Sequence, residues 1–521
     1  MNINLFKKYF FHAFLASFLI TLSTLVIIIT ENMGEIGLKP IIVSILEISA
    51  AIIIILFILS IINMRLAWFV PLGLILNFQY ENLFNLFSNY INISPLIFIA
   101  CSGIIWILSI LIFWNTKYED YKNVNYILSL TIFVGSLAQS FLIFNKEVSE
   151  VSIQPLITSQ EFAPKSEYLS KELPDIIYIV PDRYASYEVL DKFYNFDNSD
   201  FYEALEKRGF IIPKNSNSNY PNTYASLLST LNLSHIESSP EKIPHSTFYS
   251  QIKNSIAFKS LTEAGYQFIN IDNWWNGTQE MELADKNFYL KNVFNFSITP
   301  YLMYNTPVYK ILTRYYPQIN HRFSCSIQEM LFNNLINEAA NQEENSFIFS
   351  HQLAPHPPYL FDRDGNCFTE RSTKLSQLAT DQVKTENDYI EGKKNYIEYL
   401  IYTNKKLIEA FDARLKKNKD FIFVIQSDEG PYPPCIQLKR KCSKNDWRIK
   451  TGNINAFFYS GKHNIGIEDL KTPINNFNYI FNIVFGEEFE KLPDDIYVNH
   501  NPSHHILGNN QNFYFRKINY E

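Results

Sequence analysis

Several features are scarce or missing in this sequence. There is no excess of basic residues, since the formal net charge is −7 and the pI is near 5.9; nucleic acid is therefore excluded as an expected partner. Glycine is rare, with 16 residues in the whole chain, whereas aromatic residues make up 16% of it. We attribute this skew to an AT-rich coding genome and not to function. Long apolar runs are almost absent after residue 146, so the chain has two parts of different character.

The apolar runs before residue 146 are long enough to cross a membrane. A bilayer core of ~30 Å takes about 20 helical residues. Four runs fit this length: Phe10–Thr30, Ile41–Ile62, Asn92–Trp114 and Tyr126–Phe144. A fifth run starts at Leu66 and is long enough only if it continues through Gln79–Phe87.

The positions of basic residues favour five spans in residues 1–145. Cytoplasmic loops carry the excess of Lys and Arg. With five spans, one side receives Lys7, Lys8, Arg65, Lys117 and Lys122; four spans would leave Lys117 and Lys122 on the wrong side. No small-residue cleavage site follows the first span before the next one, so we expect the N-terminal segment to be retained. The chain after residue 145 is then extracytoplasmic.

The remaining chain is predicted to be a linker and an α/β domain. Residues 146–173 mix charge, serine and proline without periodicity, which indicates a linker. Residues 174–521 alternate strand-like and helix-like runs, which is typical of a mostly parallel central sheet. We expect strands at Ile176–Val180, Gln267–Ile271, Ser346–Ser350, Phe421–Gln426 and Ala456–Tyr459, and helices at Phe201–Arg208, Tyr224–Leu231, Ile256–Ala264 and Tyr389–Lys416.

Four of the five cysteines lie in the predicted exported domain, which suggests disulfides. Cys435 and Cys442 bracket the short polar loop IQLKRK, which a bridge could close. Free buried thiols are the alternative.

Acidic and histidine side chains follow the predicted strands. Asp182 comes directly after IIYIV-Pro181, and the strand FIFVIQS is followed by Asp428 and Glu429. In open α/β sheets ligands bind at the carboxyl ends of strands, and carboxylates favour Mg²⁺, Ca²⁺ or Mn²⁺. Capping of the next helix is the competing interpretation of Asp182. His351 and His356 lie on the proline-rich loop HQLAPHPPYLFD.

The segment NSNSNYPNTYASLLSTLN, residues 215–232, predicts a helix start with Asn222 or Thr223 as the N-cap. The amides at such a terminus favour phosphate or sulfate. A plain helix start explains the pattern equally.

Taken together, these motifs resemble a known family. PDIIYIVPDRYAS, SNYPNTYASLLSTLN, HQLAPHPPYLFD, IQSDEGP and NYIFNIVFGEEFEKLPDDIYV occur in that order. They look like the membrane-anchored, sulfatase-like proteins of bacterial envelope loci, within the alkaline phosphatase superfamily. Five spans before an exported domain also resemble lipoteichoic acid synthases and phosphoethanolamine transferases. The resemblance implies a multi-pass protein of the bacterial inner (cytoplasmic) membrane.

The resemblance also implies a mechanism. In that superfamily an acid after the first strand, a nucleophile before the helix and a late Asp-His pair hold metal. The nucleophile then attacks phosphorus or sulfur to form a covalent intermediate. By this correspondence Asp182, Asn219, Asp428 and Glu429 fall on metal positions. Because Glu429 stands where relatives carry histidine, Mn²⁺, Mg²⁺ or Ca²⁺ is expected in preference to Zn²⁺.

The nucleophile position departs from the family. Alignment with the Thr-aromatic-Pro-Asn-His-Tyr motif of related phosphodiesterases places Asn219 there, and an amide is not a competent nucleophile. Ser218 is the first substitute and Thr223 the second, although either could only cap the helix. Asn222 falls where relatives hold a substrate oxygen. By the same resemblance His356 is a general acid and His351 a substrate contact; His351 could instead bond to the loop backbone.

Two functions follow from these patterns. The leading one is a metal-dependent envelope enzyme that transfers or hydrolyses a phosphate- or sulfate-ester-linked group on surface glycans or lipids. A multi-span anchor suits a membrane lipid or lipid-linked donor with a surface glycan acceptor, which rests on analogy of architecture. The alternative is a catalytically silent relative that binds a glycan or a partner in polysaccharide assembly.

Overall fold

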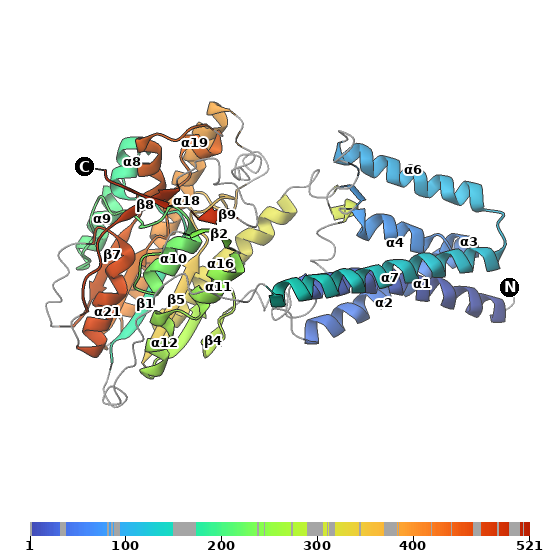
Figure 1. The fold of residues 1–521 in the computed structure, drawn as a ribbon, viewed down its shortest axis with the longest axis horizontal. Coiled ribbons are helices and arrows are strands. Elements are labelled where there is room, and N and C mark those ends of the chain that lie inside the picture. Colours follow the sequence, from blue (N-terminus) through green and yellow to red (C-terminus); the bar gives the residue numbers. More distant parts are fainter. Residues whose placement is uncertain are drawn as a thin grey trace. The chain divides into compact units, whose positions relative to one another are not determined.

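Figure 1 shows the fold of the protein as a computed structural model, in which two compact units can be distinguished. One unit contains Met1–Ser152 and Lys291–Pro317, and the other contains Ile153–Leu290 and Gln318–Glu521. The structure describes residues 3–31, 38–80, 83–84, 87, 94–149, 173–236, 239–243, 245–271, 273, 275–288, 306–309, 311, 318–342, 345–368, 383, 385–417, 419–438, 440–461, 470–486, 489–499, 511–513 and 515–520. Most of the predicted linker 146–173 lies outside these residues.

The first unit is helical. Its long helices are α1 (Ile3–Glu31), α2 (Leu38–Ile62), α6 (Pro95–Phe113) and α7 (Tyr118–Ser149). The short helices α3 (Met64–Ala67) and α4 (Val70–Phe78) follow α2. Within the described residues, four apolar stretches are long enough to cross a membrane: Tyr9–Thr30, Ile41–Ile62, Leu96–Phe113 and Tyr118–Leu142. The apolar stretch Met64–Phe78 is shorter. The chain is therefore membrane-anchored, and the count of five spans stays a prediction.

Apolar side chains cover the outside of these helices. Leu111 and Ile112 of α6 are 68% and 70% exposed. Many Ile and Leu residues of α2 and α7 are also exposed. Large exposed apolar surfaces are rare on soluble proteins and mark contact with a membrane or a partner. The exposure pattern thus agrees with helices that face lipid.

The second unit is built on a six-stranded sheet in the order β4-β3-β5-β1-β6-β7. Its strands are β1 (Asp175–Pro181), β3 (Gln267–Ile271), β4 (Lys286–Asn287), β5 (Ser346–Gln352), β6 (Phe421–Gln426) and β7 (Asn455–Tyr459). All neighbours pair in parallel except β6 and β7. The predicted mostly parallel sheet is confirmed, and each of the five predicted strands overlaps an observed one.

Helices cover both faces of this sheet, so alternate residues of β1 are buried on opposite sides. Tyr178 packs in a core with α10 (Thr223–Leu231), α11 (His245–Lys253), α12 (Ile256–Glu263) and α21 (Asn476–Phe485). Ile177 packs in a second core with α8 (Tyr187–Tyr194), α9 (Ser199–Glu206), α16 (Gln318–Asn341) and α18 (Glu386–Leu415). Buried on both faces, the central strands are the uncharged runs that parallel sheets require.

The remaining elements in the described part of the chain are short. They are β2 (Ser239–Ile243), α19 (Pro434–Gln437), α20 (Lys444–Thr451), η2 (Pro473–Asn475), β8 (Ile496–Asn499), β9 (Gln511–Phe513) and β10 (Phe515–Ile518). β2 pairs with β9, and β8 pairs with β10, in both cases antiparallel.

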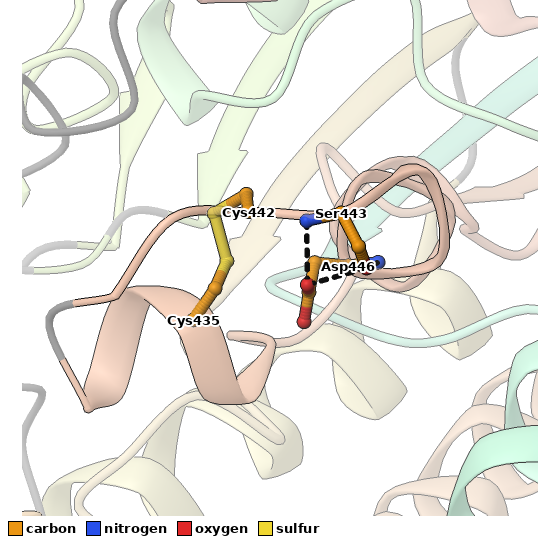
Figure 2. The surroundings of a disulfide bond; sticks show 4 residues. All are labelled: Cys435, Cys442, Ser443 and Asp446. Carbon is orange, nitrogen blue, oxygen red and sulfur yellow. Dashed lines mark hydrogen bonds between the residues drawn. A yellow bond between two sulfur atoms is a disulfide. The ribbon is translucent and has the colours of Figure 1, made fainter.

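Two disulfides close loops of this unit. Cys325 on α16 is bonded to Cys367, and Cys435 on α19 is bonded to Cys442. Figure 2 shows the second bridge, which joins α19 to Cys442, the residue before the Ser443 N-cap of α20. The predicted Cys435–Cys442 bridge is therefore confirmed, and the bonds fit an exported domain.

Candidate active site

Three buried side chains meet at the carboxyl ends of the central strands. Asp182 follows β1 directly, His351 lies near the end of β5, and Asp428 follows β6. These three strands are adjacent and parallel, so their ends lie at one edge of the sheet. One ligand atom from each of the three side chains lies within 4.8 Å of the others.

The backbone after β1 is held in an unusual turn. Arg183 has a φ of 63°, a left-handed conformation that few residues other than glycine adopt. Its N–H donates to Asp428 Oδ1 (3.0 Å), and its carbonyl accepts a bond from the Tyr396 hydroxyl (2.9 Å). The N–H of Asp182 donates to the carbonyl of Gln352 (2.8 Å). These bonds stabilise the turn and fix Asp182 beside Asp428.

The imidazole of His351 is oriented by a hydroxyl. Its Nδ1 lies 2.9 Å from Thr278 Oγ1, and its Nε2 lies 3.9 Å from Asp182 Oδ2. Burial lowers the pKa of His351 to about 3, so the ring is neutral at physiological pH. Metal-binding histidines usually have their second ring nitrogen held in this way. No sequence pattern pointed to Thr278.

The cluster leaves polar atoms without hydrogen bonds. Among the described residues, Asp182 Oδ1, Asp428 Oδ2 and His351 Nε2 are buried and have no hydrogen-bond partner. Such atoms are costly unless a ligand satisfies them. Two carboxylates and an imidazole suit Mn²⁺ or Zn²⁺, and the carboxylates alone suit Mg²⁺ or Ca²⁺. The residues present therefore fit a divalent cation.

The electrostatics of the two carboxylates point the same way. Burial, and then the charge of Asp428, raise the pKa of Asp182 well above its usual value, although the charge of Arg183 opposes them. Two buried carboxylates this close disfavour each other's ionisation. A cation between them would offset that penalty.

Glu429, which the sequence placed among the metal ligands, has two cationic partners. Its Oε1 lies 2.9 Å from Arg183 Nε and 2.7 Å from Lys450 Nζ, and all three side chains are buried. Burial raises the pKa of Glu429, while burial lowers the pKa of Lys450 to about 8. The metal role of Glu429 stays a prediction.

Sequence reasoning missed two residues of this group, Tyr432 and Lys450. The Arg183 guanidinium carbon lies 3.6 Å from the centre of the Tyr432 ring, and Lys450 Nζ lies 4.3 Å from it. Cations so placed are attracted to the face of an aromatic ring. Lys450 sits late in the polar helix α20, where nothing in the sequence separates it from a solvated lysine.

Ser218 and Asn219 of the predicted nucleophile segment both bond to backbone groups. Ser218 is buried; its hydroxyl donates to the carbonyl of Tyr220 (2.8 Å) and its N–H to that of Thr451 (2.7 Å). The side-chain amide of Asn219 donates to the carbonyl of Asp495 (2.9 Å) and accepts from the N–H of Ile474 (3.2 Å). Both side chains thus bond to backbone, and their predicted roles stay predictions.

The next two residues begin α10. Asn222 is the N-cap and makes no side-chain capping bond, and its buried Nδ2 has no hydrogen-bond partner among the described residues. Thr223 is the first helical residue. Burial, and next the charge of Glu429, raise the pKa of Tyr224, so the first turn of α10 lies near the Glu429 group.

His356 lies on the loop after β5. Its Nδ1 contacts the carbonyl of Pro357, and only a protonated Nδ1 can donate there, which leaves Nε2 to exchange a proton. Burial, and then the charge of Arg183, lower its pKa well below the usual value. His356 also lines a cavity of about 80 Å³ with Asn273, Gln328, Leu331, Leu353 and Leu360.

Comparison with known families identifies the class of this chain. The sulfatase family matches residues 197–468, just over half of the chain. The chain therefore belongs to the sulfatase family, and the resemblance inferred from its motifs is confirmed at that level. In a comparison with curated proteins, none matches.

The solved structures that match this chain include a periplasmic domain and an integral membrane protein. The C-terminal periplasmic domain of EcEptC from Escherichia coli is 13% identical, with a TM-score of 0.40, and the match covers 70% of this chain and 97% of that one. The integral membrane protein lipooligosaccharide phosphoethanolamine transferase A from Neisseria meningitidis is 10% identical, with a TM-score of 0.37, covering 91% and 95%. Because these TM-scores are low, the assignment of this chain to the sulfatase family rests on the family match alone.

Proposed function

We propose that this chain is a membrane-anchored enzyme that transfers or hydrolyses a phosphate- or sulfate-ester-linked group with the help of one bound divalent cation. The observation that carries the proposal is the cluster of Asp182, His351 and Asp428. Each offers a buried ligand atom with no hydrogen-bond partner among the described residues, and these lie at the carboxyl edge of the sheet. A merely structural cluster would bond these atoms internally.

Asp182, Asp428 and His351 would hold the metal, through two carboxylate oxygens and the neutral Nε2. A bound divalent cation supplies positive charge to the transferring group and lowers the pKa of an attacking hydroxyl. The imidazole favours Mn²⁺ or Zn²⁺ over Ca²⁺ and Mg²⁺, so we propose Mn²⁺ first, within the set that the sequence suggested. Thr278 keeps His351 oriented by bonding to Nδ1.

Thr223 is the nucleophile that we propose. It opens α10, where the helix amides and dipole favour an anionic group. The Ser218 hydroxyl is instead bonded to a backbone carbonyl and buried. Asn222 Nδ2, a buried donor, would hold an oxygen of the transferring group.

His356 would exchange the proton of the reaction. Because Nδ1 faces the Pro357 carbonyl, Nε2 is the atom that gives or takes it. The lowered pKa keeps the ring neutral in the free enzyme, so it is ready to accept a proton first. An anionic substrate would raise this pKa and allow the proton to be returned to the leaving group.

For the substrate, we propose a lipid-linked donor and a surface glycan acceptor. The four apolar helices place the chain at a membrane, and two disulfides suit an extracytoplasmic domain. A site tied to the membrane encounters lipid-linked donors more often than soluble ones.

The test uses the full chain in detergent, stripped of metal and supplied with Mn²⁺, Mg²⁺, Ca²⁺ or Zn²⁺. Hydrolysis of p-nitrophenyl phosphate, bis-p-nitrophenyl phosphate and p-nitrophenyl sulfate is measured for the native chain and for Asp428→Asn. Asp412→Asn is the matched control, because Asp412 pairs with Arg208 on the surface. We expect metal-dependent turnover that only Asp428→Asn abolishes. Metal binding without turnover of any ester, including lipid-linked donors, would favour the silent, glycan-binding alternative.

A further inference from the structure

The buried group of charges around Asp182 contains its own cations. Three carboxylates, those of Asp182, Asp428 and Glu429, are accompanied by the guanidinium of Arg183 and the ammonium of Lys450. With all five ionised, the group has one uncompensated negative charge.

The two side-chain cations are directed at Glu429 and not at the cluster of Asp182, His351 and Asp428. Arg183 Nε lies 2.9 Å from Glu429 Oε1 but 3.7 Å from Asp182 Oδ1. Lys450 Nζ lies 2.7 Å from the same Glu429 oxygen. Glu429 is also missing from the group of atoms close enough to share a metal ion.

The backbone around Lys450 is fixed from both sides. The N–H of Gly430, next to Glu429, donates to the carbonyl of Lys450 (2.8 Å). A Cβ at position 430 would lie 2.1 Å from the carbonyl oxygen of Ile449, so only glycine allows the two segments to approach. At its other end α20 begins at the Ser443 cap, which bonds to Asp446 just after the Cys435–Cys442 bridge (Figure 2).

We propose that Glu429 is a charge-pairing residue and not a metal ligand: Arg183 and Lys450 hold its Oε1, and it acts on the neighbouring cluster through its charge. Lys450 is then a positioning residue that holds Glu429 and offsets its charge. This inference rests on the proposed function, because it takes Asp182, His351 and Asp428 as the metal site.

A double-mutant cycle tests the role of Glu429. Mn²⁺ affinity and stoichiometry are measured by calorimetry on the metal-free full chain, for the native protein, Glu429→Gln, Lys450→Met and the double variant. Removing the negative charge alone should weaken Mn²⁺ about tenfold, and removing the positive charge alone should tighten it about as much. The double variant has the native net charge, so its affinity should return to within about threefold of the native value.

The result that overturns the inference is a double variant as weak as Glu429→Gln, because a lost ligand cannot be restored by removing a lysine. Loss of Mn²⁺ binding in every protein, the native chain included, would instead overturn the proposed function. The two failures are thus distinguishable. Thermal unfolding of each metal-free variant identifies any that do not fold.

Discussion

The backbone N–H of Arg183 donates to Asp428 Oδ1 at 3.0 Å, which joins the turn after β1 to the residue after β6. One oxygen of Asp428 is used in this way, and the other has no hydrogen-bond partner among the described residues. The same turn directs the Arg183 side chain to Glu429. Arg183, with its left-handed backbone, therefore contacts both kinds of acid: its N–H bonds to Asp428, which is proposed to bind metal, and its side chain pairs with Glu429.

The nucleophile can be identified by comparing two hydroxyls. Thr223→Ala should abolish turnover and labelling by a covalent phosphate probe, because the proposed attacking oxygen is lost. Ser218→Ala should retain labelling and lose about 1 kcal/mol of stability with its buried hydrogen bond to Tyr220. Mass spectrometry of the labelled peptide checks the site. Label on Ser218, or undiminished labelling of Thr223→Ala, would show that the assignment is wrong.

Gly430 should tolerate no side chain. In Gly430→Ala the new Cβ would lie 2.1 Å and 2.7 Å from the carbonyl oxygens of Ile449 and Gly452, and backbone atoms cannot rotate away. We expect a loss of roughly 2–4 kcal/mol of unfolding free energy. Gly486→Ala is the control: its φ of +65° carries strain but its Cβ would meet nothing within 4 Å, so about 1 kcal/mol is expected. Equal thermal unfolding of both variants would refute the crowding argument.

His235 should make the stability depend on pH. Burial lowers its pKa, its Nε2 bonds to the carbonyl of Pro493 (2.9 Å), and its buried Nδ1 has no hydrogen-bond partner in the described part of the chain. The unfolded state therefore binds the proton first. As pH falls below about 6.5, stability is lost until the pH passes the lower folded pKa, by up to about 1.4 kcal/mol per pH unit.

The measurement is chemical unfolding at pH 7.5 and 5.5 for the native chain and for His235→Gln. The variant keeps a donor for Pro493 but cannot take up a proton, so its loss of stability on acidification should be smaller. An identical loss in both proteins would exclude His235 as a source of the pH dependence.

The two disulfides should contribute unequally. The Cys325–Cys367 bridge spans 42 residues and the Cys435–Cys442 bridge spans 7. From loop-closure entropy, removing the first by paired Cys→Ser substitutions should cost about 4 kcal/mol, and removing the second about 2.5 kcal/mol. Unfolding of the two variants under oxidising conditions compares them. A larger loss for the short loop would mean that strain or packing outweighs chain entropy.

The sheet could be predicted because burial on both faces leaves a clear pattern. The run IIYIV of β1 and the run FIFVIQ of β6 contain no charge, and a polar residue follows each where the chain leaves the sheet. The meeting of Asp182 and Asp428 could therefore be expected from adjacent parallel strands. The count of spans was harder, because Met64–Phe78 is apolar but short.

The partners of those acids could not be predicted. Thr278 and Lys450 reach the site from a loop and from a polar helix that no motif marks. The position of His351 beside Asp182, and the pairing of Glu429, depend on side-chain directions that a linear pattern does not contain. Sequence could name the acids, but only the structure shows that Glu429 Oε1 pairs with Arg183 and Lys450.

Anomalous scattering from crystals of the full chain grown with Mn²⁺ tests the central claim most directly. The account predicts one peak, within coordination distance of Asp182, Asp428 and His351 Nε2, and none at Glu429. A peak bound by Glu429, or saturated crystals with no peak between Asp182 and Asp428, would contradict it.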